Sequence, residues 1–207
     1  MGIVHRATLT PSKQELVESW LPSRGWAAGR RVVDKVGEYR LDDPAGEVGV
    51  ETILWRADDG AVLQTPLTYR AEPLDGADAH LIGTCDHSVL GRRWVYDACG
   101  DPVWATTLVA AIRTGGAQSP MYFEQDGERI DIPARVEVRG SGSADSTEPV
   151  AAVDSVSDDG DITTVAADAT RIALARVVGT PLGEGEQLSG TIVDGGQTSV
   201  LAVLVKH

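Results

Sequence analysis

Apolar residues recur at helical spacing in two stretches of the chain, residues 10–21 and 101–116. In the first, "TPSKQELVESWL", Ser12 and Glu15 have the spacing of a capping box ahead of the apolar stripe. In the second, "DPVWATTLVAAIRTGG", Asp101 stands before a first-turn proline, and two glycines close the segment. The predicted stripes are Leu16, Val17, Trp20 and Leu21 in the first helix, and Trp104, Leu108, Ala111 and Ile112 in the second.

Elsewhere the pattern has the period of two that is typical of half-buried strands. Residues 48–71 predict two strands joined by a tight turn at Asp59 and Gly60. Residues 87–98, "HSVLGRRWVYDA", predict a further strand. More candidate strands follow the second helix, at residues 129–138, 161–167, 170–178, 187–193 and 198–205.

The pattern changes near residues 114–128, where glycine and proline cluster and helical periodicity ends. We therefore predict one domain over residues 1–118 and a β-rich domain over residues 119–207. The predicted fold class is α+β: a cap of two helices on an antiparallel β-sheet, followed by an all-β antiparallel domain. Between the later strands, residues 140–149, "GSGSADSTEP", predict a flexible loop.

The composition is that of an ordinary globular protein, with 42% hydrophobic and 24% charged residues among 207. The formal net charge of −13 repels phosphate backbones and anionic lipid, so we expect neither nucleic acid nor membrane surfaces as partners. No apolar stretch has the length of a signal peptide or a membrane span. With only two cysteines in the chain, this favours a cytoplasmic location.

A cluster of potential metal ligands or nucleophiles lies between residues 80 and 99. It comprises His80, Cys85, His87 and Cys99. Their spacing matches no structural zinc pattern, although Cys85 and His87 would share one face of a strand. We predict no metal and no cofactor, and we interpret the thiols as small buried hydrophobic groups. A small metal or thiol enzyme centred on Cys85 and His87 is the alternative.

The C-terminal segment combines glycines with a lysine on an apolar strand. Gly183 and Gly185 precede the strands and Lys206 ends the last one, an arrangement similar to the nucleotide-binding half of a kinase-like lobe. The dinucleotide pattern G-x-G-x-x-G fails because residue 188 is leucine. Turn glycines in an antiparallel sheet are the other interpretation. The catalytic carboxylates of a kinase would follow the lysine, and so we expect no phosphoryl transfer by this chain alone.

Three sequence stretches resemble the N-terminal cap of actinobacterial maltokinases, and more closely the stand-alone cap-like proteins related to them. The stretches are "ESWLPSRGWAAGRR", "LTYRAEPLDGA" and "HSVLGRRWVYDACGDPVWATTL", and the likeness covers residues 1–113. The tail "GEGEQLSGTIVDGGQTSVLAVLVKH" is similar to the glycine-rich loop and lysine strand of the maltokinase intermediate lobe. The resemblance implies a cap followed by a degenerate kinase N-lobe, with Gly183, Gly185 and Lys206 near the nucleotide.

The same resemblance implies a link to glycogen and trehalose metabolism through maltose 1-phosphate. Our hypothesis is a non-catalytic cytoplasmic binding or regulatory protein whose partner is a protein, such as a kinase lobe or a glucan-metabolising enzyme. Half of a split sugar kinase, completed by a separate helical lobe, is an alternative. Trp26, Arg92 and Arg93 are the candidates for a ligand or partner surface. An exposed final strand, residues 198–207, would allow a homodimer.

Overall fold

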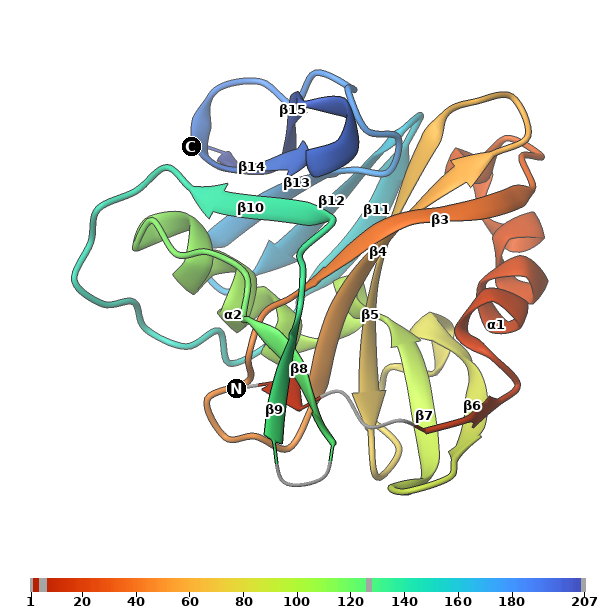
Figure 1. Ribbon diagram of the computed structural model, residues 1–207. Coiled ribbons are helices and arrows are strands. Elements are labelled where there is room, and N and C mark those ends of the chain that lie inside the picture. The colour runs from red at the N-terminus through yellow and green to blue at the C-terminus, as the bar shows by residue number, and fades with distance from the viewer. Residues whose placement is uncertain (1, 4–6, 126–127, 206–207) are drawn as a thin grey trace.

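Two large antiparallel sheets and a small sheet make up most of the molecule (Figure 1). The computed structural model describes residues 2–3, 7–125 and 128–205. The N-terminal sheet has the order β2 (Leu9–Thr10), β6 (Leu81–His87), β7 (Gly91–Asp97), β5 (Val62–Arg70), β4 (Gly49–Ala57), β3 (Val32–Arg40). The C-terminal sheet has the order β10 (Val136–Gly140), β14 (Gly185–Ile192), β15 (Gln197–Val205), β13 (Thr170–Ala175), β12 (Ile162–Ala167), β11 (Ser155–Asp159). The small sheet consists of β1 (Gly2–Ile3), β8 (Met121–Gln125) and β9 (Glu128–Ile132).

Both predicted helices form, each at the cap that its sequence indicates. Helix α1 (Lys13–Trp20) has the complete capping box of Ser12 and Glu15, and α2 (Pro102–Arg113) is capped by Asp101. Short 3-10 helices occur at η1 (Leu21–Ser23), η2 (Gly25–Ala27), η3 (Asp78–His80), η4 (Ala98–Gly100) and η5 (Val193–Gly195). No helix in the described part of the chain is both long and apolar enough to cross a membrane.

The N-terminal sheet is covered on both faces, which explains the almost continuous burial of β4 and β5. Along β4, Ile53 and Trp55 point to the face that carries α1, and Val50 and Leu54 point to the face toward α2. The predicted hairpin between β4 and β5 is confirmed, with Gly60 at a φ of +87° in its turn.

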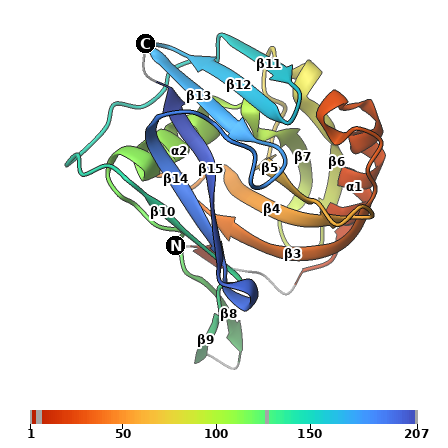
Figure 2. The ribbon, with the colours of Figure 1, turned by 90° about the horizontal axis from the view of Figure 1, so that it is seen from above.

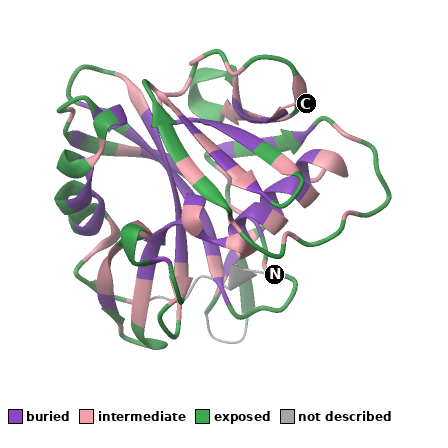
Figure 3. Ribbon diagram, turned by 180° about the vertical axis from the view of Figure 1, so that it is seen from behind, coloured by how far each residue is buried: buried purple, intermediate pink, exposed green. Residues whose placement is uncertain are grey.

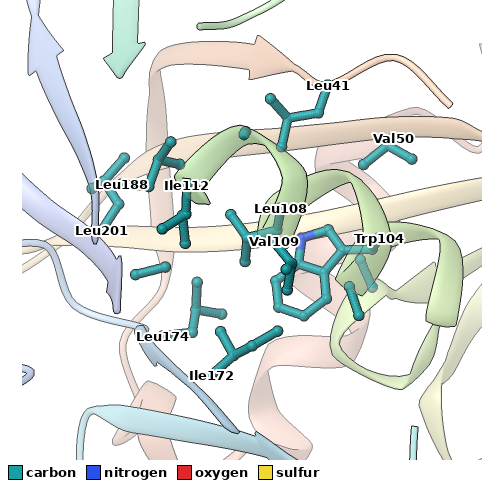
Figure 4. Packing of buried hydrophobic residues seen from close by; sticks show 14 of the residues in the cluster. Leu41, Val50, Trp104, Leu108, Val109, Ile112, Ile172, Leu174, Leu188 and Leu201 are labelled. Atoms are coloured by element: carbon teal, nitrogen blue, oxygen red, sulfur yellow. The ribbon is translucent and has the colours of Figure 1, made fainter. Parts of the chain in front are cut away.

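Helix α2 lies between the C-terminal sheet and the N-terminal sheet (Figures 1 and 2). Its residues Leu108 and Ile112 meet Leu174 and Leu201 from one sheet and Val50 from the other (Figure 4). Figure 3 shows buried positions gathered on the inner strands and on α2, with exposed positions on the outer loops. One hydrophobic cluster therefore contains residues from both sides of the predicted boundary between residues 118 and 119, and that boundary stays a prediction.

The structure corrects three details of the strand assignment. Residues 87–98 are not one strand, because Ser88–Leu90 turn the chain between β6 and β7, with Gly91 at a φ of +74°. The segment 129–138 is interrupted at Pro133, whose missing N–H separates β9 from β10. The final strand β15 is no exposed edge, because it pairs with β13 on one side and β14 on the other.

The predicted flexible loop at residues 140–149 has a structural role at its beginning. It contains no helix, and beyond Gly140 no strand. The N–H of Gly142 donates to the Ile112 carbonyl and that of Ala144 to the Arg113 carbonyl, so this loop caps the end of α2.

Candidate functional site

The cysteines and histidines nominated as metal ligands or nucleophiles are not brought together. Cys85 belongs to the cluster under α1, whereas Cys99 belongs to the cluster around α2, on the opposite face of the N-terminal sheet. The His87 Nδ1 accepts hydrogen bonds from the N–H groups of Val89 (3.2 Å) and Leu90 (3.1 Å). Within the described ranges no group of three or more His, Cys, Asp or Glu residues is arranged to hold a metal.

Both thiols are poor nucleophiles in this setting. Cys85 and Cys99 are free and buried, and burial raises the pKa of each thiol, most strongly at Cys99. A thiol attacks as its thiolate, so a raised pKa lowers its reactivity at neutral pH. The remaining candidate, His80, places its ring where a side chain on Gly100 would stand. Cys85, Cys99 and His80 thus have the contacts of side chains packed within the fold.

A buried arginine that the sequence analysis did not single out connects the two halves of the molecule. Arg176 follows β13, is 1% exposed, and donates from Nη2 to Asp97 Oδ2 at 2.6 Å. The same Nη2 donates to Cys99 Sγ at 3.3 Å, and Nε donates to Thr163 Oγ1 at 2.7 Å. Burial disfavours the charged form of Arg176, but the Asp97 carboxylate outweighs it and raises the pKa of the guanidinium. The only sequence signal for this ion pair is a charged residue within an apolar strand segment.

Trp26 was predicted to belong to an exposed ligand or partner surface, and the structure corrects this placement. Its side chain is only 1% exposed and lies in η2 within the cluster under α1. It packs edge-on against Trp20 with ring centroids 5.6 Å apart, and the Arg176 guanidinium carbon lies 4.8 Å from its ring centroid. Trp26 therefore contributes to packing in the interior.

Arg92 and Arg93 lie on the β6–β7 hairpin, where Arg92 is exposed and Arg93 is half-buried. The turn before them exposes two aliphatic residues, Val89 at 57% and Leu90 at 46%. Arg92 lies over the half-buried Trp94 ring, 5.5 Å from its centroid. Among the described residues no carboxylate forms an ion pair with either arginine. We call these five residues the hairpin surface.

The glycines nominated for nucleotide binding have different roles. Gly183 is exposed, has a φ of +83° and has open space around its Cα. A side chain on Gly185 would collide with the carbonyl oxygen of Leu204 on the neighbouring strand, so close strand packing explains this glycine. Lys206 lies outside the described residues.

A hollow of about 550 Å³ beside the end of α1 was not anticipated from the sequence. It is lined by Glu18, Leu21, Pro22, Arg30, Arg31, Val32, Val33 and Asp58. Arg30 Nε pairs with Asp59 at 2.8 Å and Arg31 Nε with Asp58 at 3.1 Å. The two arginines that line the hollow are therefore already paired with aspartates of the β4–β5 turn.

The fold and these surfaces define a mostly antiparallel β protein whose N-terminal sheet carries an exposed, cationic hairpin. Residues 20–101, from the end of α1 to the cap of α2, match the family model described as the maltokinase N-terminal cap domain. The match includes the whole hairpin surface and confirms the resemblance to maltokinase caps. No curated protein matches the chain.

Proposed function

We propose that this protein is a non-catalytic binding or regulatory protein of the cytoplasm, linked to maltose 1-phosphate metabolism, and that it docks a protein partner through the hairpin surface. The match of residues 20–101 to a maltokinase cap domain supports the metabolic link, and glycogen and trehalose are the pathways that this link implies. The two free, buried thiols support a reducing compartment.

The observation that carries the proposal is the composition of the hairpin surface. Arginine and tryptophan are enriched in protein interfaces, and here they stand beside two exposed aliphatic side chains. Successive residues of a strand point to opposite faces, so Arg92 shares a face with Trp94 while Arg93 points to the other. The hairpin thus offers a positive charge on each side of an apolar tip.

These groups fit a partner that presents carboxylates around an apolar recess. Arg92 and Arg93 have no carboxylate partner among the described residues, so acidic groups on another protein could form ion pairs with them. A kinase lobe and a glucan-metabolising enzyme are the partners we propose to test first.

The experiment compares the wild-type chain with Arg92→Glu/Arg93→Glu and with a matched control, Arg139→Glu/Arg171→Glu, which reverses two exposed charges on the C-terminal sheet. Each is immobilised, and retained proteins from the native extract are identified, purified and titrated against it. We expect one partner to bind wild type and control alike, and the hairpin variant at least about tenfold more weakly. Equal binding by all three, or maltose phosphorylation by the purified chain alone, would refute the proposal.

A second candidate function is half of a split sugar kinase, in which the C-terminal sheet acts as a degenerate kinase N-lobe. The exposed Gly183, at a φ of +83° two residues before the start of β14, is the observation that favours it. This function requires that the chain bind ATP and that Lys206→Ala weaken the binding. A flat titration at millimolar ATP would count against it.

A further inference from the structure

The outer strand of the small sheet is an exposed edge. Among the described residues, strand β9 pairs with β8 alone, and the β8–β9 hairpin protrudes from the body (Figure 2). Four of its five residues are exposed, among them Ile130 at 38%. An uncovered edge presents unpaired N–H and C=O groups to any strand that can approach.

The central three residues of β9, Arg129 to Asp131, are complementary to their own reverse. The strand reads Glu-Arg-Ile-Asp-Ile over residues 128–132. If two copies pair antiparallel about Ile130, Arg129 of each copy lies opposite Asp131 of the other, and the two Ile130 side chains lie opposite each other. Opposite charges therefore meet at Arg129 and Asp131, whereas Glu128 of each copy lies opposite Ile132 of the other.

The two faces of such a pair are also matched. Arg129 and Asp131 share one face, where Nε and Oδ1 are 2.6 Å apart, and the Arg129 guanidinium carbon lies 4.2 Å from the Tyr122 ring centroid. On that face, two copies would form two cross-strand pairs of opposite charge, each joining Arg129 of one copy to Asp131 of the other. On the other face, Ile130 stands opposite Phe123 of β8, so two copies would join their Ile130 and Phe123 side chains into one apolar stripe, with Glu128 and Ile132 beside it.

We propose that β9 is a dimerisation strand, and that it pairs antiparallel with β9 of a second copy of this chain across a twofold axis. The occupant is a second copy because the charge order fits its own reverse. The contact is isologous and consumes both edges, so it ends at the dimer and does not build a fibre.

Charge-reversal variants test the pairing in the full chain. Arg129→Asp presents only carboxylates on the charged face of β9, and Asp131→Arg presents only guanidinium groups. We expect wild type to dimerise in sedimentation equilibrium, and each single variant to dimerise at least about tenfold more weakly. An equimolar mixture of the two variants should restore the dimer, and so should the double variant Arg129→Asp/Asp131→Arg. Arg171→Asp, an exposed change on β13, should dimerise like wild type.

A cross-link tests the register. Ile130→Cys places two thiols opposite each other at the twofold axis, whereas Val193→Cys, on a residue that is 46% exposed, places one far from β9 in sequence. Mild oxidation should link Ile130→Cys into a dimer much faster than Val193→Cys, because only Ile130→Cys places two thiols opposite each other. The native cysteines are 2% and 0% exposed, so they should not form cross-links in either variant. A monomeric wild type, unchanged dimerisation in both single charge variants, or equal cross-linking at the two sites would each overturn the proposal.

Discussion

A single buried carboxylate fixes the start of α1 to the N-terminal sheet. Glu51 is 2% exposed and receives hydrogen bonds from Lys13 Nζ at 2.6 and 2.8 Å and from the Tyr69 hydroxyl at 3.0 Å. Burial alone would raise the pKa of Glu51, but the charges of Lys13 and Arg40 and these hydrogen bonds outweigh it and lower the pKa from 4.5 to about 2. The ionised carboxylate is thus part of the folded state.

The stability of the protein should therefore fall in acid. A depressed carboxylate pKa contributes stability above its unfolded value, and this contribution is lost as the pH falls from about 4.5 toward about 2. We expect Lys13→Met to reduce the free energy of unfolding by about 2 kcal/mol at pH 7, and to reduce the loss of stability between pH 5 and about 3. Lys35→Met breaks the more exposed ion pair with Glu38 and should change the free energy of unfolding by less than about 1 kcal/mol. Urea titrations at pH 7, pH 5 and about pH 3 measure these differences. Equal effects of the two variants would contradict a stabilising role for the ionised Glu51.

The buried pair of Arg176 and Asp97 should behave as one energetic unit. Arg176→Met leaves a carboxylate that is 4% exposed without its partner, and we expect a loss of about 3–5 kcal/mol in the free energy of unfolding. Asp97→Asn should also destabilise, and the double variant should lose less than the sum of the two single losses. A double-mutant cycle by urea denaturation checks this, and additive losses would show that the pair is not coupled.

At the scale of elements, the two helix caps differ in what they support. Ser12 caps an exposed helix start, whereas Asp101 is 0% exposed, accepts from the Val103 N–H at 2.9 Å and pairs with both Arg70 Nε and Nη2 at 2.7 Å. We expect Asp101→Ala to cost about 3 kcal/mol of unfolding free energy, and Ser12→Ala about 1 kcal/mol. The loss of unfolding free energy for Asp101→Asn should fall between these two values, because this variant keeps the cap acceptor and loses the charge. Denaturant midpoints rank the three variants, and equal midpoints for the two alanine variants would contradict this.

Local signals explain which elements the sequence predicts. The helices and the β4–β5 hairpin follow from caps, turn residues and periodicity that lie within a few residues of one another. Strand β3 was missed because it has bulges at Val32/Asp34 and Lys35/Gly37, and each bulge shifts the alternation by one residue. Strand β11 was missed because Ser155–Asp159 is a polar edge strand in which Val156 is the single apolar residue.

The surroundings of the candidate surface residues were not predictable from the sequence. The sequence predicts one strand over residues 87–98, and so misses the turn that stands before Arg92 and Arg93. The burial of Trp26 depends on contacts with Arg176, which is distant in the sequence. The same holds for the ion pair of Arg176 with Asp97, because nothing near either residue in the sequence indicates the other.

At the scale of the whole molecule, the two large sheets share one hydrophobic interior. Helix α2 belongs by sequence to the predicted domain 1–118, but it contacts β10, β14 and β15 of the C-terminal sheet. Leu188 and Leu201 of that sheet pack in the same cluster as Leu108 of α2. Gln64 of β5 also donates to the carbonyls of Ala175 and Leu201 at 2.8 and 3.1 Å. The cap-like region thus completes its interior with the C-terminal half.

A fragment of residues 1–118 should therefore not fold by itself as it does in the full chain. Without the C-terminal sheet, Leu108 and Ile112 would face water, and the buried Asp97 would lose Arg176. We expect the fragment to bind a hydrophobic dye and to unfold over a broad denaturant range, whereas a chain of residues 7–207, which keeps both large sheets, should unfold in one sharp transition. Adding residues 119–207 as a separate polypeptide should restore the sharp transition if the shared interior holds the halves together. A fragment of residues 1–118 that unfolds cooperatively and excludes the dye would show instead that the cap-like region is an independent domain.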